Sequence, residues 1–169
     1  NNLVVSELNY RPEPATDEEK VAGFSSRGDF EFIELLNINT TRSINLEGVN
    51  FAGGIDFTFN GNLAAEALVL PPGGRVVLVD NVEAFNFRYP NSTAIIGGNY
   101  AGNLSNDGEQ IHIVSSNGTT IKDFTYNDVA PWPKSPDGDG FTLTLVDPDK
   151  NPDHSDPSNW AASSNIGGS

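Results

Sequence analysis

The chain has 169 residues, of which 37% are hydrophobic, and this is enough for one domain with a sizeable core. It contains no cysteine, which excludes disulfide bonds, thiolate metal sites and a cysteine nucleophile. The formal net charge of -14 disfavours nucleic acids and anionic membranes as partners, and it favours solubility, divalent cations and basic partners.

The first two strands are predicted near the start of the chain. Residues 3–10 (LVVSELNY) alternate between two faces, as a half-buried strand does. Residues 11–27 are polar and carry two prolines and an acidic run, so they predict a long loop. Residues 29–37 (DFEFIELLN) alternate again, with apolar side chains on both faces and a carboxylate on each. A strand covered on both faces is predicted to lie in the middle of its sheet.

Short β segments follow at the spacing of a sandwich, punctuated by Gly, Asn and Pro. They are predicted over residues 44–46, 49–51, 55–59, 68–70 and 75–80. Asn81 is a suitable cap for a short helix over residues 82–89, which Pro90 ends. This is the only helix that the sequence predicts.

A β-hairpin is predicted over residues 109–115 and 119–126, because Asn117-Gly118 between them tolerates positive φ angles. Ile121 is out of phase with Phe124, which indicates a β-bulge near Lys122 and Asp123. Residues 141–147 predict a last long strand. The polar stretch after it offers Trp160 as its one anchor in the core. Together these elements predict an all-β, antiparallel sandwich with one short helix in a loop.

Several motifs in this order resemble the lamin-tail domain family, in the form found in large bacterial secreted and surface proteins. The motifs are VVSELNY, FEFIELLN, INLEGVNF, LPPGGRVVLVD, LSNDGEQIHIVSSNG, IKDFTYND, PWP, DGDGFTLTL and NWAAS. The resemblance implies an immunoglobulin-like β-sandwich that serves as a non-catalytic module. Residues 11–27 and 81–103 look longer than in a minimal lamin tail. A coiled-coil rod and a basic surface are absent, so filament assembly and DNA binding are not carried over.

Glu7 and Glu34 are the main candidate site residues. If the first two strands pair in the register that their patterns imply, both carboxylates lie on one face, close enough to share a cation. Calcium, a hard ion that prefers oxygen ligands, would suit them, and Asp128 could supply a third oxygen. The alternative, which we favour, is that both carboxylates pair with arginine or with backbone donors. A hydrolase that uses the two carboxylates is a further alternative.

Other candidate motifs have simpler explanations. Asp137-Gly138-Asp139-Gly140 and the acidic run over residues 147–156 resemble calcium loops, but turn formation explains both. The second run is not an EF-hand, because Pro152 replaces the required glycine and Ser158 replaces the bidentate glutamate.

The two histidines of the chain do not suggest an active site. Two are too few for a histidine-rich zinc site, and His112 lies on a strand where it should face solvent. The contiguous residues His154-Ser155-Asp156 cannot form a triad, which needs side chains that converge from separate segments.

Trp132 stands between two prolines and is a candidate aromatic platform for sugars or peptides, although a packing role fits the resemblance better. The chain starts at Asn1, contains no methionine and has no signal peptide, so we expect residues 1–169 to be one domain of a longer precursor. The expected function is that of a non-catalytic binding or structural module of an exported bacterial protein, at the cell surface or outside the cell. A calcium-dependent carbohydrate- or protein-binding module is the main alternative.

Overall fold

Strands β1 (Leu3–Asn9) and β2 (Phe32–Asn37) form the centre of the larger sheet in the computed structural model, which describes residues 2–168. The six strands follow the order β11-β10-β1-β2-β6-β7. The other members are β6 (Arg75–Val79), β7 (Ile96–Asn99), β10 (Leu143–Leu145) and β11 (Trp160–Ala162). All neighbours pair antiparallel except β6 and β7, which are parallel because a helix carries the chain back between them.

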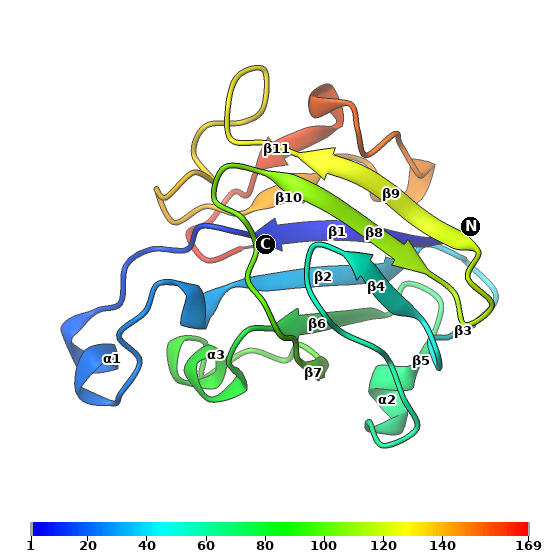
Figure 1. Cartoon of the computed structure of the whole chain (residues 1–169), viewed down its shortest axis with the longest axis horizontal. Helices are drawn as coiled ribbons and strands as arrows, with labels where there is room; N and C mark the ends of the chain where they lie inside the picture. Colours follow the sequence, from blue (N-terminus) through cyan, green and yellow to red (C-terminus); the bar gives the residue numbers. More distant parts are fainter. Residues whose placement is uncertain (1, 169) are drawn as a thin grey trace.

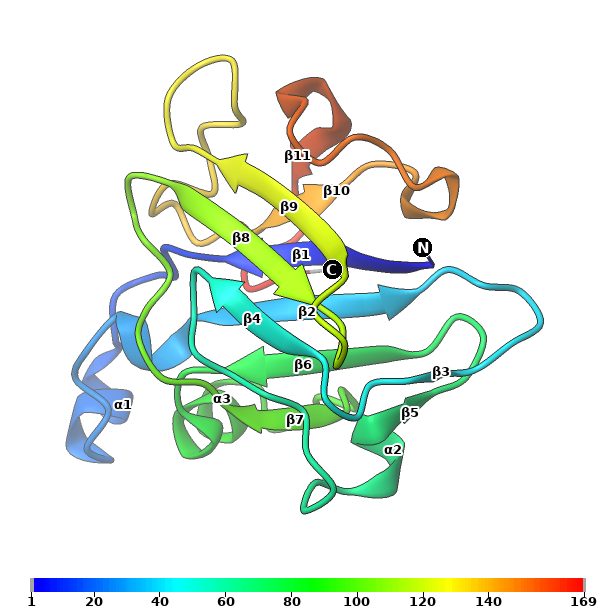
Figure 2. The same ribbon diagram turned by 45° about the vertical axis from the view of Figure 1, so that its right-hand side comes forward.

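A three-stranded sheet packs across one face of the larger sheet (Figures 1 and 2). It consists of β4 (Asn50–Gly53), β8 (Glu109–Val114) and β9 (Thr120–Tyr126), and β3 (Ile44–Asn45) pairs with β5 (Val69–Leu70) beside it. The predicted hairpin is confirmed: β8 and β9 pair antiparallel around Gly118, whose φ is 80°. The bulge falls slightly earlier than predicted, since Ile113 faces Lys122 while Val114 faces Thr120.

The main core lies between the two sheets. Leu8, Ile33 and Leu78 of the larger sheet are fully buried there against Ile111 and Phe124 of the smaller one. Burying one such side chain contributes about 1.5–3 kcal/mol, so this double layer is the main source of stability. The structure is therefore a mostly antiparallel β-sandwich of immunoglobulin-like type, as predicted.

Two predicted strands differ in the structure. Gly28–Phe30 is a 3-10 turn, in which the amide of Phe30 donates to the carbonyl of Arg27, so β2 begins only at Phe32. The segment 55–59 sends Phe57 and Phe59 into the core, but it is joined to its neighbours only by isolated bridges. Alternating apolar residues therefore report burial correctly here without a continuous ladder of hydrogen bonds.

The predicted helix is confirmed as α3 (Val82–Arg88), where the side chain of Asn81 accepts hydrogen bonds from the amides of Glu83 and Ala84. The expectation of a single helix is wrong. Helix α1 (Asp17–Val21) lies in the predicted loop and begins with a capping box between Thr16 and Glu19. The remaining helices are α2 (Ala65–Leu68) and the 3-10 turns Pro148–Lys150 and Pro157–Asn159. None of the helices in residues 2–168 is long and apolar enough to cross a membrane.

The last part of the chain completes the larger sheet. β10 pairs with β1 and is shorter than predicted, and β11, which was not predicted, pairs with β10. Trp160 is buried, as expected, and its indole N–H donates to the carbonyl of His154 at 2.8 Å. Its ring contacts that of Phe124, so β11 is tied to both sheets.

Helix α3 covers part of the opposite face of the larger sheet, which we call the outer face. Phe85 of α3 packs there on Phe32, Val77 and Val79 in a second, smaller cluster. Because α3 is short, it leaves the rest of the outer face hollow.

Candidate functional site

The hollow on the outer face holds a cavity of about 420 Å³. Its floor includes Glu7, Phe32 and Glu34 of the larger sheet, Arg88 and Tyr89 at the end of α3 form one wall, and the segment 166–168 lies over it. Cavities of about 250 and 380 Å³ continue it at either end and share lining residues with it. We call the three together the outer groove. This groove was not predicted from the sequence.

Glu7 and Glu34 are partners in the register of β1 and β2, which confirms that the two carboxylates lie opposite one another on the same face. Glu34 forms an ion pair with Arg75 and accepts a hydrogen bond from the hydroxyl of Ser6 at 2.5 Å. The carboxylate of Glu7 is buried and accepts from the hydroxyl of Thr142 at 2.5 Å. Glu34 is therefore paired with an arginine, as the favoured alternative has it for both carboxylates, whereas Glu7 bonds to a side-chain hydroxyl.

Asp128 lies in the loop after β9, where its charge acts on Tyr10 and Arg11. Burial raises the pKa of the Tyr10 phenol, and the carboxylates of Asp137 and Asp128 raise it further. Among residues 2–168, no three His, Asp or Glu side chains come close enough together to hold a metal ion. Calcium at Glu7 and Glu34 stays a prediction, as does a hydrolase built on these two residues.

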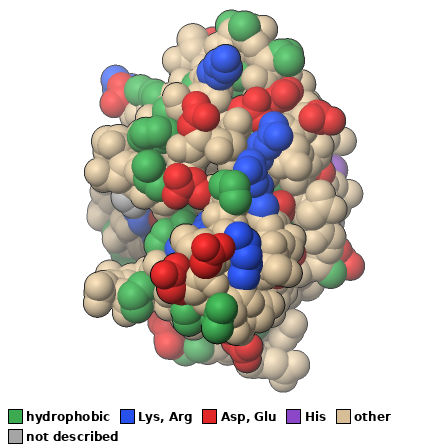
Figure 3. All heavy atoms as spheres, turned by 90° about the vertical axis from the view of Figure 1, so that its left-hand side faces the viewer, with side chains coloured by type: hydrophobic (Ala, Val, Ile, Leu, Met, Phe, Trp, Pro, Cys, Tyr) green, Lys and Arg blue, Asp and Glu red, His purple; other side chains and the backbone are tan. Residues whose placement is uncertain are grey.

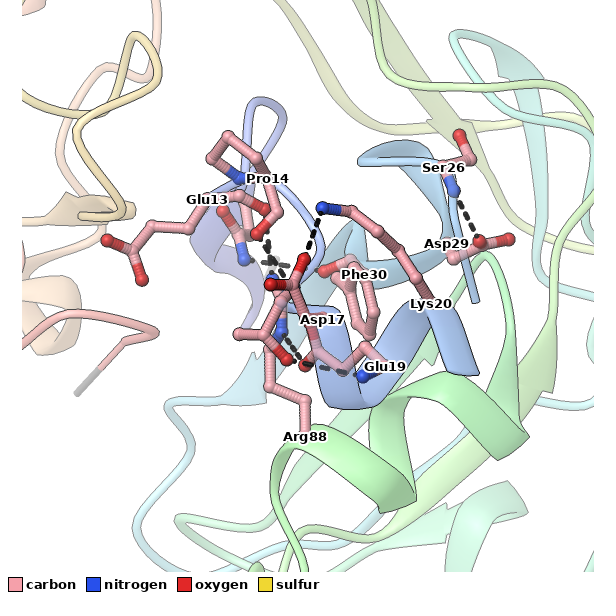
Figure 4. A network of polar contacts seen from close by, with 11 residues as sticks. Glu13, Pro14, Asp17, Glu19, Lys20, Ser26, Asp29, Phe30 and Arg88 are labelled. Carbon is pink, nitrogen blue, oxygen red and sulfur yellow. Dashed lines mark hydrogen bonds and ion pairs between the residues drawn. The ribbon is translucent and has the colours of Figure 1, made fainter. Parts of the chain in front are cut away.

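Arg88 holds the wall of the outer groove in place (Figure 4). Its guanidinium donates two hydrogen bonds to the carboxylate of Glu19 in α1, both at 2.7 Å, and it lies 3.3 Å from the centre of the Phe30 ring. The side chains of Arg88 and Glu19 are 13% and 5% exposed, so this is a largely buried ion pair. Arg88 lowers the pKa of the Glu19 carboxyl. The contact joins α1 to α3 and so shapes one end of the groove.

Trp132 and the two histidines lie away from the outer groove. Trp132 is partly buried and packs against the main core, with its ring 6.3 Å from that of Trp160. Its role as a ligand platform stays a prediction. His112 is half-buried on β8, next to the hydroxyl of Thr120. His154 is buried with both ring nitrogens facing backbone carbonyls, those of Pro152 and Val5.

Glu31 is a buried carboxyl that the sequence did not single out. It precedes β2 and accepts hydrogen bonds from the amide of Leu104 at 2.7 Å and from the hydroxyl of Tyr100 at 3.3 Å. It thereby holds the crossover between β7 and β8 against the larger sheet. Burial raises the pKa of Glu31 to about 7, although the bond from Leu104 opposes this shift.

The raised pKa of Glu31 predicts a pH dependence of stability. In the unfolded chain this carboxyl ionises near pH 4.5, and in the folded chain only near pH 7. Its contribution to the free energy of unfolding is therefore fully present below pH 4.5 and is lost as the pH rises to 7. Burial lowers the pKa of His154 to about 4, so the contribution of His154 to the free energy of unfolding changes in the opposite direction and rises between pH 4 and 6.5. Glu31→Gln lacks the titration of the Glu31 carboxyl. Its free energy of unfolding, relative to that of the wild type, should therefore rise by roughly 3 kcal/mol between pH 4.5 and 7.

Urea unfolding of both proteins at several pH values measures this gain directly, because the His154 contribution is common to both and cancels. Glu66→Gln is the control, since Glu66 is exposed on α2 and the same change there should leave the difference from the wild type independent of pH. A difference between Glu31→Gln and wild type that does not change with pH would contradict the prediction.

Sequence reasoning missed most of the outer groove. The capping box Thr16-x-x-Glu19 was present as a signal for α1, but nothing in the pattern links Glu19 to Arg88, which lies 69 positions later. The segment 166–168, Ile-Gly-Gly, carries no motif that would place it over Glu7.

Comparison with known proteins adds a family assignment. The family model described as Lamin Tail Domain matches residues 1–128. This range contains β1 to β9 and the floor and wall of the outer groove, whereas the segment 166–168 lies outside it. Neither the search of curated proteins nor that of solved structures produced a match.

Proposed function

The chain belongs to the lamin tail domain family, and from this premise we propose that it is a non-catalytic binding module of a larger exported bacterial protein. The module acts outside the cell or at its surface, and it recognises a protein partner. It neither binds nucleic acid nor inserts into a membrane.

The observation that carries this proposal is the outer groove itself. Its cavities are continuous over the outer face of the larger sheet, and two of its charged groups, Glu34 and Arg88, are engaged in ion pairs with Arg75 and Glu19. Ion pairs of this kind fix the positions of the two charged side chains and so define the shape of the groove. A general acid or base would instead have to be free to exchange a proton with a bound substrate.

The charge distribution supports a protein partner over a nucleic acid. At the end of the molecule that carries α1, Lys and Arg side chains lie among Asp and Glu side chains (Figure 3). Arg11 pairs with Asp137 and Lys20 with Asp17 at this end. Interspersed charges do not form the continuous basic surface that phosphate binding requires, and the net charge of -14 opposes it further.

Cosedimentation with cell-envelope fragments of the bacterium that exports the protein tests the proposal. Ala94→Trp places a large side chain at the shared edge of two of the cavities, and we expect it to weaken cosedimentation about tenfold, a change of roughly 1.4 kcal/mol. Ala52→Trp is the matched control, because Ala52 is exposed on β4 of the other sheet.

Wild type and Ala52→Trp should cosediment equally, and prior digestion of the fragments with trypsin should abolish the binding of both. The proposal is wrong if the wild type does not cosediment, if digestion has no effect, or if Ala94→Trp binds as well as the control.

A further inference from the structure

We infer that the outer groove is a site for a peptide turn that carries two adjacent glycines, and that the segment 166–168, itself a turn, occupies it as an internal copy of this ligand. The inference rests on the proposed function, for which it names the chemistry of the partner. It depends on four features of the groove: the contact of its walls with the glycine backbone, a backbone hydrogen bond, an unpaired acceptor, and unfilled space.

The walls of the groove leave no room for a side chain at either glycine. A β-carbon on Gly167 would lie 2.8 Å from the ring of Tyr89, and one on Gly168 would lie 2.6 Å from the carboxylate of Glu7. Neither neighbour can easily give way, because the Tyr89 ring packs on Phe85 and the Glu7 carboxylate is buried and bonded to Thr142. Both glycines also have positive φ, 82° and 119°, which disfavours other residues.

The groove also contacts the backbone of the segment directly. The amide of Gly167 donates to the carbonyl of Gly140 at 2.7 Å, and Gly140 lines the 250 Å³ cavity. Recognition through backbone groups together with the exclusion of side chains selects a glycine pair. The polar groups that line the groove can supply the hydrogen-bonding partners that a peptide backbone needs.

Asn9 provides an acceptor that has no donor. It lines the same cavity, its side chain is almost fully buried, and its amide oxygen is one of two buried polar side-chain atoms in residues 2–168 that have no hydrogen-bond partner. A buried acceptor of this kind is normally satisfied. A peptide amide that enters the cavity beside Gly167 would supply the missing N–H.

The segment 166–168 does not fill the groove and is held weakly. The 380 Å³ cavity extends past it toward Arg75 and Thr93 and contains none of its residues. Ile166 is 58% exposed, so its side chain contributes little burial, and the bond from the amide of Gly168 to the carbonyl of Asn165, at 3.4 Å, closes a turn within the segment and does not hold it to the groove. A longer peptide can therefore displace the segment and make contacts that the segment lacks.

Calorimetric titration with end-blocked peptides tests the inference on the whole chain. The variant Gly168→Val pushes its own segment out of the groove, and we expect it to bind the peptide Asn-Ile-Gly-Gly-Ser about tenfold more tightly than the wild type, in which the tethered segment competes. Gly23→Val is the matched control: Gly23 also has a positive φ, 103°, but nothing lies within 4 Å of the position of its β-carbon. It should bind the peptide as the wild type does.

The peptide Asn-Ile-Ala-Ala-Ser should bind none of the three proteins. The inference is overturned if Gly168→Val, folded by circular dichroism, does not bind the glycine peptide, or if it binds both peptides equally. If the glycine peptide fails while cosedimentation with envelope fragments still depends on Ala94, the inference falls and the proposed function stands.

Discussion

Replacing Arg88 with alanine should lower the free energy of unfolding by about 3–5 kcal/mol, the usual cost of removing one partner from a buried ion pair. The substitution leaves the Glu19 carboxylate buried and without its two hydrogen bonds from the guanidinium. It also removes the contact with the Phe30 ring and the bond from Arg88 to the carbonyl of Glu13 at 3.2 Å. The packing of α1 on α3 depends on these contacts.

Urea unfolding followed by circular dichroism measures the loss. Lys20→Ala is the control in α1, the helix that carries Glu19, because Lys20 pairs with Asp17 on the surface and its removal should change stability by less than about 0.5 kcal/mol. Arg88→Lys should be nearly as unstable as Arg88→Ala, since an ammonium cannot reproduce the two-pronged contact. A loss below about 1 kcal/mol for Arg88→Ala would show that water reaches Glu19 and replaces the arginine.

Replacing Trp160 with alanine should cost about 3–5 kcal/mol, as expected for the loss of a large aromatic side chain from a core. Trp160 is 4% exposed and packs against Phe124 and His154. It lies beyond residues 1–128, which match the family model, yet β11 pairs with β10, which in turn pairs with β1 at the centre of the larger sheet. The variant therefore tests whether the last 41 residues, 129–169, belong to the same cooperative unit.

Thermal and urea unfolding of Trp160→Ala should show one transition at a lower midpoint. Trp132→Ala is the matched control: Trp132 is only partly buried, so its loss should cost roughly half as much. The prediction fails if Trp160→Ala unfolds in two separate steps or matches the wild type, because either outcome would make residues 129–169 an appendage of the fold.

The local pattern predicted individual elements well where one periodicity dominated. The β8–β9 hairpin, the Asn81 cap of α3 and the shared face of Glu7 and Glu34 are all as predicted. Local patterns were misleading where two signals competed. Residues 28–30 alternate like a strand, but Asp29 accepts a hydrogen bond from the amide of Ser26 and stabilises a turn.

By itself, the sequence determined the all-β class and the positions of the main strands along the chain, because these follow from alternation and turn residues that act over a few positions. The family followed from the resemblance of its ordered motifs. Only the tertiary structure decided which surfaces meet. The pairing of Arg88 with Glu19, the burial of Glu31 and the position of Gly167 and Gly168 over the outer groove join residues far apart in the chain. Such contacts are selected by the packing of the whole molecule, and no short pattern encodes them.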